Sequence, residues 1–133
     1  MSQIKPVVSR PLSPHLQIYR PMLSTAMSIM HRITGLGLAV GILGYVIWLT
    51  VAATSDQNFI FVQGLLSSWL GLLVLFGMSW ALIHHMLGGL RHFVWDSGHG
   101  FKLNHVEWLV RANIIGSITL TILLWALSYG VHS

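Results

Sequence analysis

Three long apolar stretches limit what this chain can fold into more than any other feature. Residues 33–55 carry no charged side chain, residues 57–90 carry no Asp, Glu, Lys or Arg, and a third apolar stretch covers about residues 112–131. A helix needs roughly 20 mostly apolar residues to cross about 30 Å of hydrocarbon, and it pairs its own backbone groups there. Only 8% of the residues are charged, against about a quarter in a soluble domain. We therefore predict an all-α membrane protein with three transmembrane helices.

The predicted domain organisation is a short arm followed by one membrane domain. All 4 prolines of the chain lie in residues 1–29, which we interpret as a polar N-terminal arm on the inner side of the membrane. Residues 30–133 then form a three-helix transmembrane anchor domain, with spans at about 30–54, 62–92 and 106–131. Three helices alone leave polar groups facing lipid, so we expect them to form part of a heteromeric helix bundle.

The positive charges predict an orientation. Lys and Arg residues precede the first span or lie between the apolar parts of the second and third, whereas the first loop carries only Asp56. By the positive-inside rule the N-terminus is inside. We predict a multi-pass protein of the bacterial inner (cytoplasmic) membrane, with the mitochondrial inner membrane as the alternative. The 7 basic residues are scattered and form no basic patch, which excludes nucleic acid as a partner.

The absence of cysteine restricts the redox chemistry of the chain. With no Cys in the sequence, the chain holds no iron–sulfur cluster, no C-x-x-C-H haem attachment and no disulfide. Any such chemistry must belong to a partner.

Four of the 8 histidines lie in or at the edge of the predicted spans: His31, His84, His85 and His92. Ionisable groups in that setting are costly and usually functional. His85 and His92 are seven apart and share a helix face with Gly88 and Gly89, which would leave room beside His85 for a flat ligand such as haem. The alternative is that both glycines only allow close helix packing, with His85 hydrogen-bonded across helices. His84 points about 100° away from His85, so both cannot ligate one iron.

The predicted depth of the candidate groups limits the number of haems. They all belong to the inner part of the membrane: His31, Arg32, His85, Arg91 and His92. Two stacked haems need ligands at two depths, and the outer half offers none. We therefore predict one haem at most.

A second candidate site precedes the first span. Ser28 and Arg32 are four apart and share a helix face, which His31 borders. A hydroxyl and a guanidinium at the inner edge can hydrogen-bond a quinone carbonyl, and the guanidinium stabilises charge developing on its oxygen. The alternative is that Arg32 only reaches toward lipid phosphates.

Three motifs carry a resemblance to a known family. The stretches RPLSPHLQIY (10–19), SIMHRITG (28–35) and HHMLGGLRHFVWD (84–96) resemble the signatures of the succinate dehydrogenase cytochrome b subunit, the larger membrane anchor of respiratory complex II. The last one contains the pattern H-x-x-x-G-x-R-H-x-x-x-D, met here by His85, Gly89, Arg91, His92 and Asp96.

The resemblance implies roles for four residues. His85 matches the axial ligand of the haem b iron, and the second ligand is expected from a small membrane anchor subunit, so that one haem is shared. His31 and Arg32 match residues near the haem propionates. Ser28 and Arg32 match this subunit's part of the ubiquinone site, where ubiquinone is the substrate.

The resemblance also implies partners. The N-terminal arm is expected to lie against an iron–sulfur subunit, which receives electrons from a flavoprotein subunit that oxidises succinate. The chain is then not an enzyme by itself but a non-flavin, lipid-embedded subunit of succinate:ubiquinone oxidoreductase that contributes to quinone reduction. Two alternatives stay open at this point: the anchor of a quinol:fumarate reductase, and a cofactor-free membrane scaffold subunit.

Overall fold

The computed structural model describes residue 18 and residues 20–132, and this part of the chain is helical, without strands. Most of the predicted N-terminal arm, 1–17 and 19, lies outside the described residues, so the division of the chain at residue 29 stays a prediction. The four helices are α1 (Leu23–Thr54), α2 (Asp56–Ser67), α3 (Trp69–Asp96) and α4 (Leu103–His132). In the described range, α1, α3 and α4 are long and apolar enough to cross a membrane. The predicted all-α class with three membrane helices is confirmed.

The helix ends differ from the predicted spans. Helix α1 begins at Leu23 and α4 at Leu103, before the apolar parts that the sequence marks. The segment 62–92, predicted as one span, is divided between α2 and α3 at Ser68. There the Ser68 hydroxyl donates to the Leu65 carbonyl at 2.6 Å and accepts from the Gly71 backbone N–H at 3.2 Å. This serine ends one helix and caps the next.

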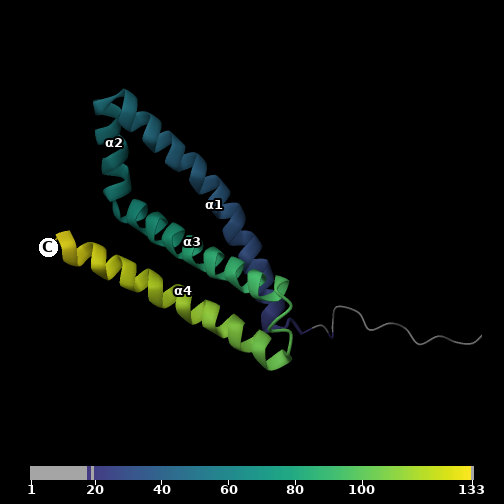
Figure 1. Cartoon of the computed structure of the whole chain (residues 1–133). Coiled ribbons are helices and arrows are strands. Elements are labelled where there is room, and N and C mark those ends of the chain that lie inside the picture. Colours follow the sequence, from purple (N-terminus) through teal and green to yellow (C-terminus); the bar gives the residue numbers. More distant parts are fainter. Residues whose placement is uncertain (1–17, 19, 133) are drawn as a thin grey trace, which may run out of the picture.

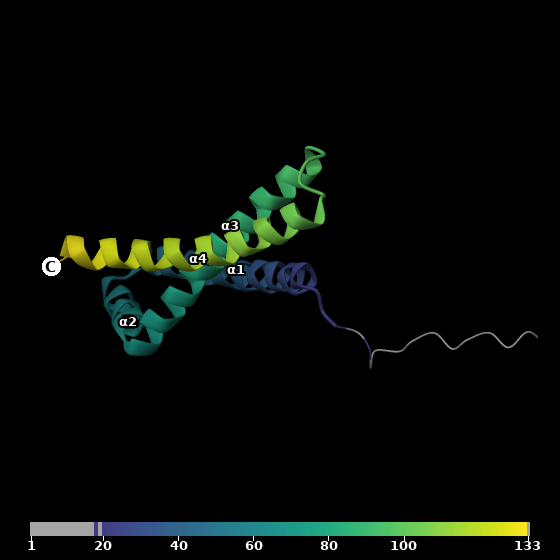
Figure 2. The same cartoon turned by 90° about the horizontal axis from the view of Figure 1, so that it is seen from below.

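The helices form an open arrangement. Figure 1 shows α1 and α3 close together at one end and apart at the other, where α2 connects them. Helix α4 runs back along α3, and the view from below shows the same pairing (Figure 2). The turn from α3 to α4 passes through Gly98 and Gly100, each with a φ of 80°. A side chain at either position would be strained, so glycine makes this turn possible.

The interior between the long helices is built from small and polar residues. Helix α3 buries a stripe with spacings of three, four and three: Ala81, His84, Gly88 and Arg91. Helix α4 buries a matching stripe: Val110, Asn113, Ser117 and Thr121. Lipid is as apolar as leucine, so membrane helices associate through close packing and interhelical hydrogen bonds. Accordingly, the large apolar side chains lie mainly on the outside of the three long helices.

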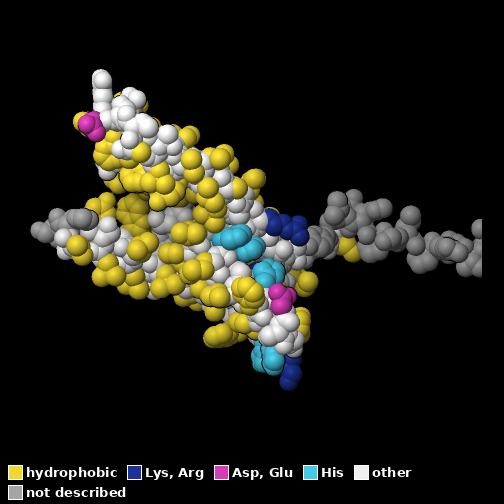
Figure 3. Space-filling model, turned by 45° about the horizontal axis from the view of Figure 1, so that its top comes forward, with side chains coloured by type: hydrophobic (Ala, Val, Ile, Leu, Met, Phe, Trp, Pro, Cys, Tyr) yellow, Lys and Arg dark blue, Asp and Glu magenta, His cyan; other side chains and the backbone are white. Residues whose placement is uncertain are grey.

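Polar contacts join α3 to α4 along these stripes. Nδ1 of His84 lies 3.2 Å from the Ser117 hydroxyl oxygen, and Nε1–H of Trp125 donates to the Ser79 hydroxyl at 3.3 Å. The space-filling view shows that lysines, arginines and histidines gather at the end of the bundle where α1 begins (Figure 3). The charge asymmetry in the sequence therefore becomes an asymmetry along the bundle.

The break between α2 and α3 generates the first prediction. A Cβ at Gly71 would collide with the Leu65 and Leu66 carbonyl oxygens, which are backbone atoms and cannot turn away. Gly71→Ala should therefore destabilise the purified membrane complex by about 1–3 kcal/mol, measured as a lower midpoint of thermal unfolding in detergent. Gly77→Ala in the same helix is the control, because a Cβ there meets nothing within 4 Å. Equal midpoints for both variants would show that the break at Ser68 is absent from the assembled protein.

Candidate functional site

His31 and His85 join α1 to α3 by a reciprocal contact. Their rings are stacked, with centroids 4.0 Å apart and planes 8° apart. Nδ1 of His85 lies 3.1 Å from the His31 carbonyl oxygen, and Nε2 of His31 lies 3.2 Å from the His85 carbonyl oxygen. A carbonyl only accepts, so each of these nitrogens carries the proton, a tautomer assigned from the partner. The Thr34 hydroxyl lies 3.4 Å from the same His85 Nδ1 and fixes the ring further.

Two glycines allow the histidine rings to approach the opposite helix. A Cβ at Gly35 in α1 would lie 2.8 Å from Cε1 of His85, and a Cβ at Gly88 in α3 would collide with the His31 ring. The sequence suggested that Gly88 and Gly89 leave room beside His85. Instead, Gly88 receives His31, which is the close-packing alternative, whereas the space above Gly89 is open.

The tautomer of His85 matters for metal binding. With its proton on Nδ1, the ring keeps the lone pair of Nε2, and Nε2 forms no hydrogen bond to any residue in the described range. Metal-ligating histidines almost always donate their other ring N–H to a carbonyl or carboxylate, which orients the ring. The donor chemistry of His85 therefore fits one axial bond to a haem iron. Among the described residues, no group of three or more His, Cys, Asp or Glu is placed to hold a metal ion.

His84 serves a different interface. It is 2% exposed, its Nδ1 contacts the Ser117 hydroxyl of α4, and its ring lies 5.0 Å from that of Trp80. His85 faces α1 instead, so the two neighbouring side chains diverge as their helical spacing predicts. His84 is therefore a packing residue between α3 and α4.

His92 continues the aromatic contacts at the same end of the bundle. The centroid of its ring lies 5.3 Å from that of His31, with the ring planes 56° apart. It also lies 5.3 Å from the ring centroid of Trp95, with the two rings edge to face. The side chain is exposed. His85 and His92 lie on the same face of α3, two turns apart, and the rings of both lie near the ring of His31.

Ser28 and Arg32 lie near the start of α1, one turn apart. The first is half-buried and the second is exposed. Neither side chain forms a hydrogen bond or ion pair to another described residue, so both polar groups are available to something outside this part of the chain. Their position beside His31 agrees with the predicted common face.

Sequence reasoning overlooked the polar residues that support the histidines. Thr34 is 4% exposed and contacts His85, whereas Ser117 is fully buried and contacts His84. The spacing of four between Asn113, Ser117 and Thr121 was a visible signal of a polar stripe on one helix face. The position of Thr34 relative to His85 depends on how α1 crosses α3, which no local pattern records.

Comparison with known proteins gives a consistent result. Residues 7–126 match the family described as "Succinate dehydrogenase/Fumarate reductase transmembrane subunit". Over 115 residues the chain is 44% identical to the succinate dehydrogenase cytochrome b556 subunit of Paracoccus denitrificans, covering 86% of this chain and 88% of the relative. It is 37% identical to the cytochrome b556 subunit of Rickettsia conorii, over 87% of this chain and 90% of that one. It is 38% identical to the cytochrome b560 subunit of Marchantia polymorpha, over 74% and 76%.

The contact of His85 with Gly35 generates the second prediction. Gly35→Ala places a methyl group against a ring that two hydrogen bonds hold in place, so we expect α1 and α3 to separate locally. The cost should be about 1–3 kcal/mol, measured as a lower thermal midpoint of the purified complex. Gly37→Ala, two residues along the same helix, should leave the midpoint nearly unchanged, since a Cβ there meets nothing within 4 Å. A midpoint that falls only for Gly37→Ala would mean that α1 is rotated relative to this arrangement.

Proposed function

The chain belongs to the succinate dehydrogenase/fumarate reductase transmembrane subunit family, and from this premise we propose that it holds one haem b jointly with a partner subunit and forms part of a ubiquinone site. As a cytochrome b membrane subunit of succinate dehydrogenase it is not the complete enzyme. The observation that carries the proposal is the state of His85: Nδ1 is bound to a carbonyl across the helix interface, and Nε2 is left with its lone pair.

We propose that His85 is the residue of this chain that binds the haem iron. When bound, haem b accepts and donates single electrons. His85 would supply an imidazole whose orientation is fixed by the carbonyl of His31, with Nε2 left to bind the iron. His84 is directed toward α4, where its Nδ1 contacts the Ser117 hydroxyl. By the resemblance to the family, the small anchor subunit would supply the second residue that holds the haem.

His31 and Arg32 are proposed to stabilise the haem propionates. The exposed Arg32 guanidinium has no partner in the described range, and a guanidinium binds a carboxylate with two parallel hydrogen bonds. The Nε2–H group of His31 donates to the His85 carbonyl, and Nδ1 would need a second proton to donate to a propionate. His31 thus positions the proposed ligand and borders the charged end of the same site.

Ser28 and Arg32 are proposed to bind the ubiquinone head group. Both donors lie on one face near the start of an otherwise apolar helix, where an isoprenoid tail can stay in lipid. The Ser28 hydroxyl would donate to a quinone carbonyl, and Arg32 would stabilise the negative charge that develops on that oxygen as it is reduced. The head group needs no covalent contact with the chain.

The surroundings of the site follow from the family. We propose that the basic end of the bundle faces the inner side of the bacterial cytoplasmic membrane, with the N-terminal arm against the iron–sulfur subunit. Electrons from succinate would then reach ubiquinone by way of the flavoprotein and iron–sulfur subunits. The family name also covers fumarate reductases, but the named relatives are succinate dehydrogenase subunits, which favours succinate oxidation.

A cofactor-free scaffold is the second candidate function, and one observation favours it. His31 and His85 close the interface between α1 and α3 by themselves, and Gly88 is filled by the His31 ring. A scaffold predicts no b-type haem band in the reduced-minus-oxidised spectrum of the purified complex, whereas the shared haem site predicts one.

The third prediction tests the ligand. His85→Ala removes the only nitrogen that this chain is proposed to offer the iron, so the b-type band should be lost or greatly weakened. His84→Ala should keep the band, because its side chain faces α4. The measurement is the reduced-minus-oxidised spectrum, normalised to assembled complex.

His84→Ala is also the control for packing damage, since it removes a fully packed imidazole from the neighbouring position. A spectrum that survives His85→Ala and disappears with His84→Ala would assign the ligand to the other histidine. Loss of the band in both variants, with assembly intact in both, would show that the spectrum reports packing rather than ligation.

The fourth prediction concerns quinone reduction. Ser28→Ala and Arg32→Leu should assemble, because both positions lie near the membrane edge and support no internal contact. A lost donor to developing charge typically costs about 2.7–4 kcal/mol, or roughly a hundred- to a thousandfold in rate. We expect ubiquinone reduction to fall by that order while succinate oxidation by an artificial acceptor, which takes electrons upstream, stays normal.

Arg111→Leu is the control, an exposed arginine at the same end of the bundle that pairs with Glu107 at 3.2 Å. Its ratio of quinone-dependent to artificial-acceptor activity should equal that of the unaltered complex. If the ratio is also unchanged in Ser28→Ala and Arg32→Leu, these residues mark membrane topology and do not bind quinone.

A further inference from the structure

Arg91 is a buried cation that lacks a counter-charge. It is 4% exposed, and its Nε and Nη1 atoms have no hydrogen-bond partner in the described range. Its guanidinium lies over the face of Trp95, whose ring centre is 5.0 Å from Cζ. An uncompensated charge in this setting is costly. Something outside the described contacts must therefore neutralise it.

No acidic side chain of this protein supplies that neutralisation. The whole sequence contains only 3 acidic residues, Asp56, Asp96 and Glu107. Glu107 pairs with Arg111, Asp56 opens α2 at the far end of α1, and Asp96 is exposed at the end of α3. The counter-anion of Arg91 has to come from another molecule.

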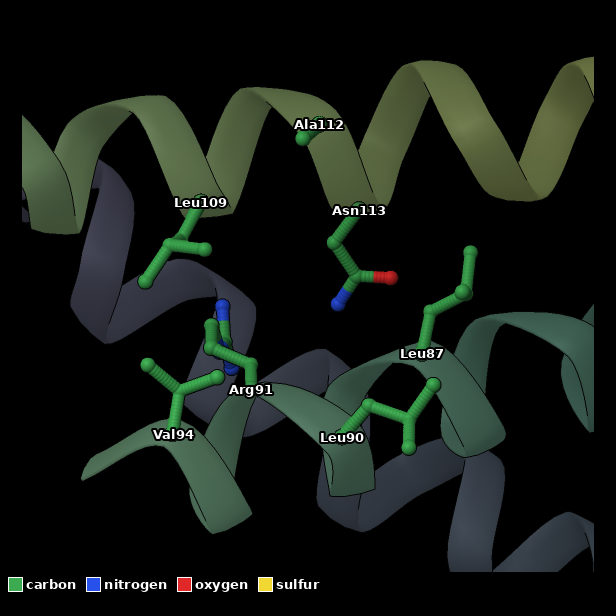
Figure 4. Close-up of a pocket in the computed structure, with 7 residues that line it drawn as sticks. All are labelled: Leu87, Leu90, Arg91, Val94, Leu109, Ala112 and Asn113. Carbon is green, nitrogen blue, oxygen red and sulfur yellow. The ribbon is translucent and has the colours of Figure 1, made fainter. Parts of the chain in front are cut away.

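Arg91 lines a pocket between α3 and α4 together with a second unpaired polar residue. Both amide atoms of Asn113 are buried without a hydrogen-bond partner, and the side chain is 4% exposed. Figure 4 shows Arg91 and Asn113 directed from the two helices into the space between them. We call this space the α3–α4 pocket; it is lined by Leu87, Leu90, Arg91, Val94, Leu109, Ala112 and Asn113.

The α3–α4 pocket is separate from the proposed haem ligand. His85 faces α1, whereas Arg91 belongs to the buried stripe that also contains His84, seven residues before it. Arg91 lies six positions after His85, which turns the two side chains about 120° apart around α3. Arg91 therefore points to a different side of α3 from His85, the residue proposed to bind the haem iron.

The size and lining of the pocket indicate the kind of ligand. Its volume is about 190 Å³, many times the roughly 10–15 Å³ that one water molecule requires. Five of its seven lining residues are apolar, and Leu90 and Val94 are exposed on the lipid-facing side, at 53% and 38%. A ligand here needs an anionic head for Arg91 and an apolar body that continues over the outer surface.

From these contacts we infer that the α3–α4 pocket binds the phosphate of a phospholipid, with its acyl chains along the outer groove between α3 and α4. The guanidinium donates to the phosphate oxygens, and Nδ2 of Asn113 adds a further donor. Arg91 precedes the end of α3 by five residues, or about 7.5 Å of helix, and so lies near the end of the bundle that carries the basic residues. The assignment goes beyond the proposed haem and quinone sites.

Native mass spectrometry of the purified complex tests this site. Delipidated complex is incubated with dioleoyl phosphatidylglycerol, with dioleoylglycerol, which has the same tails without phosphate, and with inorganic phosphate alone. We expect one phosphatidylglycerol to bind and dioleoylglycerol to bind far less. Arg91→Met and Asn113→Leu should each lower phosphatidylglycerol affinity, the first by about ten- to hundredfold. The control Arg111→Met removes an exposed arginine and should bind as the unaltered complex does.

Each other outcome overturns the assignment. Unchanged lipid affinity in Arg91→Met, or equal binding of dioleoylglycerol, would show that the pocket does not recognise phosphate. Inorganic phosphate that binds while phosphatidylglycerol does not would assign the site to free anions. If Arg91→Met fails to assemble, Asn113→Leu decides: assembled complex with full lipid affinity would mean that the lipid binds outside the α3–α4 pocket.

Discussion

Hydrocarbon offers no hydrogen bonds, so each polar group inside this bundle has to find its partner in protein or bound ligand. The contact between His31 and His85 meets this requirement most completely, because each imidazole donates to the backbone carbonyl of the other helix. Gly35 and Gly88 allow the approach. This contact fixes how α1 crosses α3, sets the tautomer of His85, and leaves one imidazole nitrogen for a ligand. The proposed haem site depends on all three.

Helix α3 presents adjacent polar residues to different neighbours. His84 stabilises the interface with α4 through Ser117, while His85 contacts α1 through His31. Arg91 belongs to the same buried stripe as His84, yet Nε and Nη1 of its guanidinium have no hydrogen-bond partner among the described residues. One helix therefore combines a packing histidine, a candidate ligand and an unsatisfied cation within two turns. The histidine contacts hold the bundle together, and the unpaired guanidinium of Arg91 indicates where another molecule binds.

Much of this arrangement follows from sequence periodicity. The three apolar stretches predict the long helices, and the helical rotation of about 100° per residue predicts that His84 and His85 diverge. The break at Ser68 was not predicted, because a serine within an apolar helix usually bonds to its own turn. The burial of Arg91 was also missed, and the filling of Gly88 by His31 agrees with the close-packing alternative rather than with open space beside His85. Both depend on the crossing of helices far apart in sequence, which local patterns do not contain.

A high-resolution cryo-electron microscopy map of the intact complex tests the assignment of His85 most directly. The family places this chain beside other subunits, and its large exposed apolar side chains are suited to lipid and to partner helices. We predict iron density at Nε2 of His85, continued contact of Nδ1 with the His31 carbonyl, and an opposite axial ligand from another subunit. Iron bound to His84, two axial ligands from this chain, or no haem between the subunits would contradict the shared site.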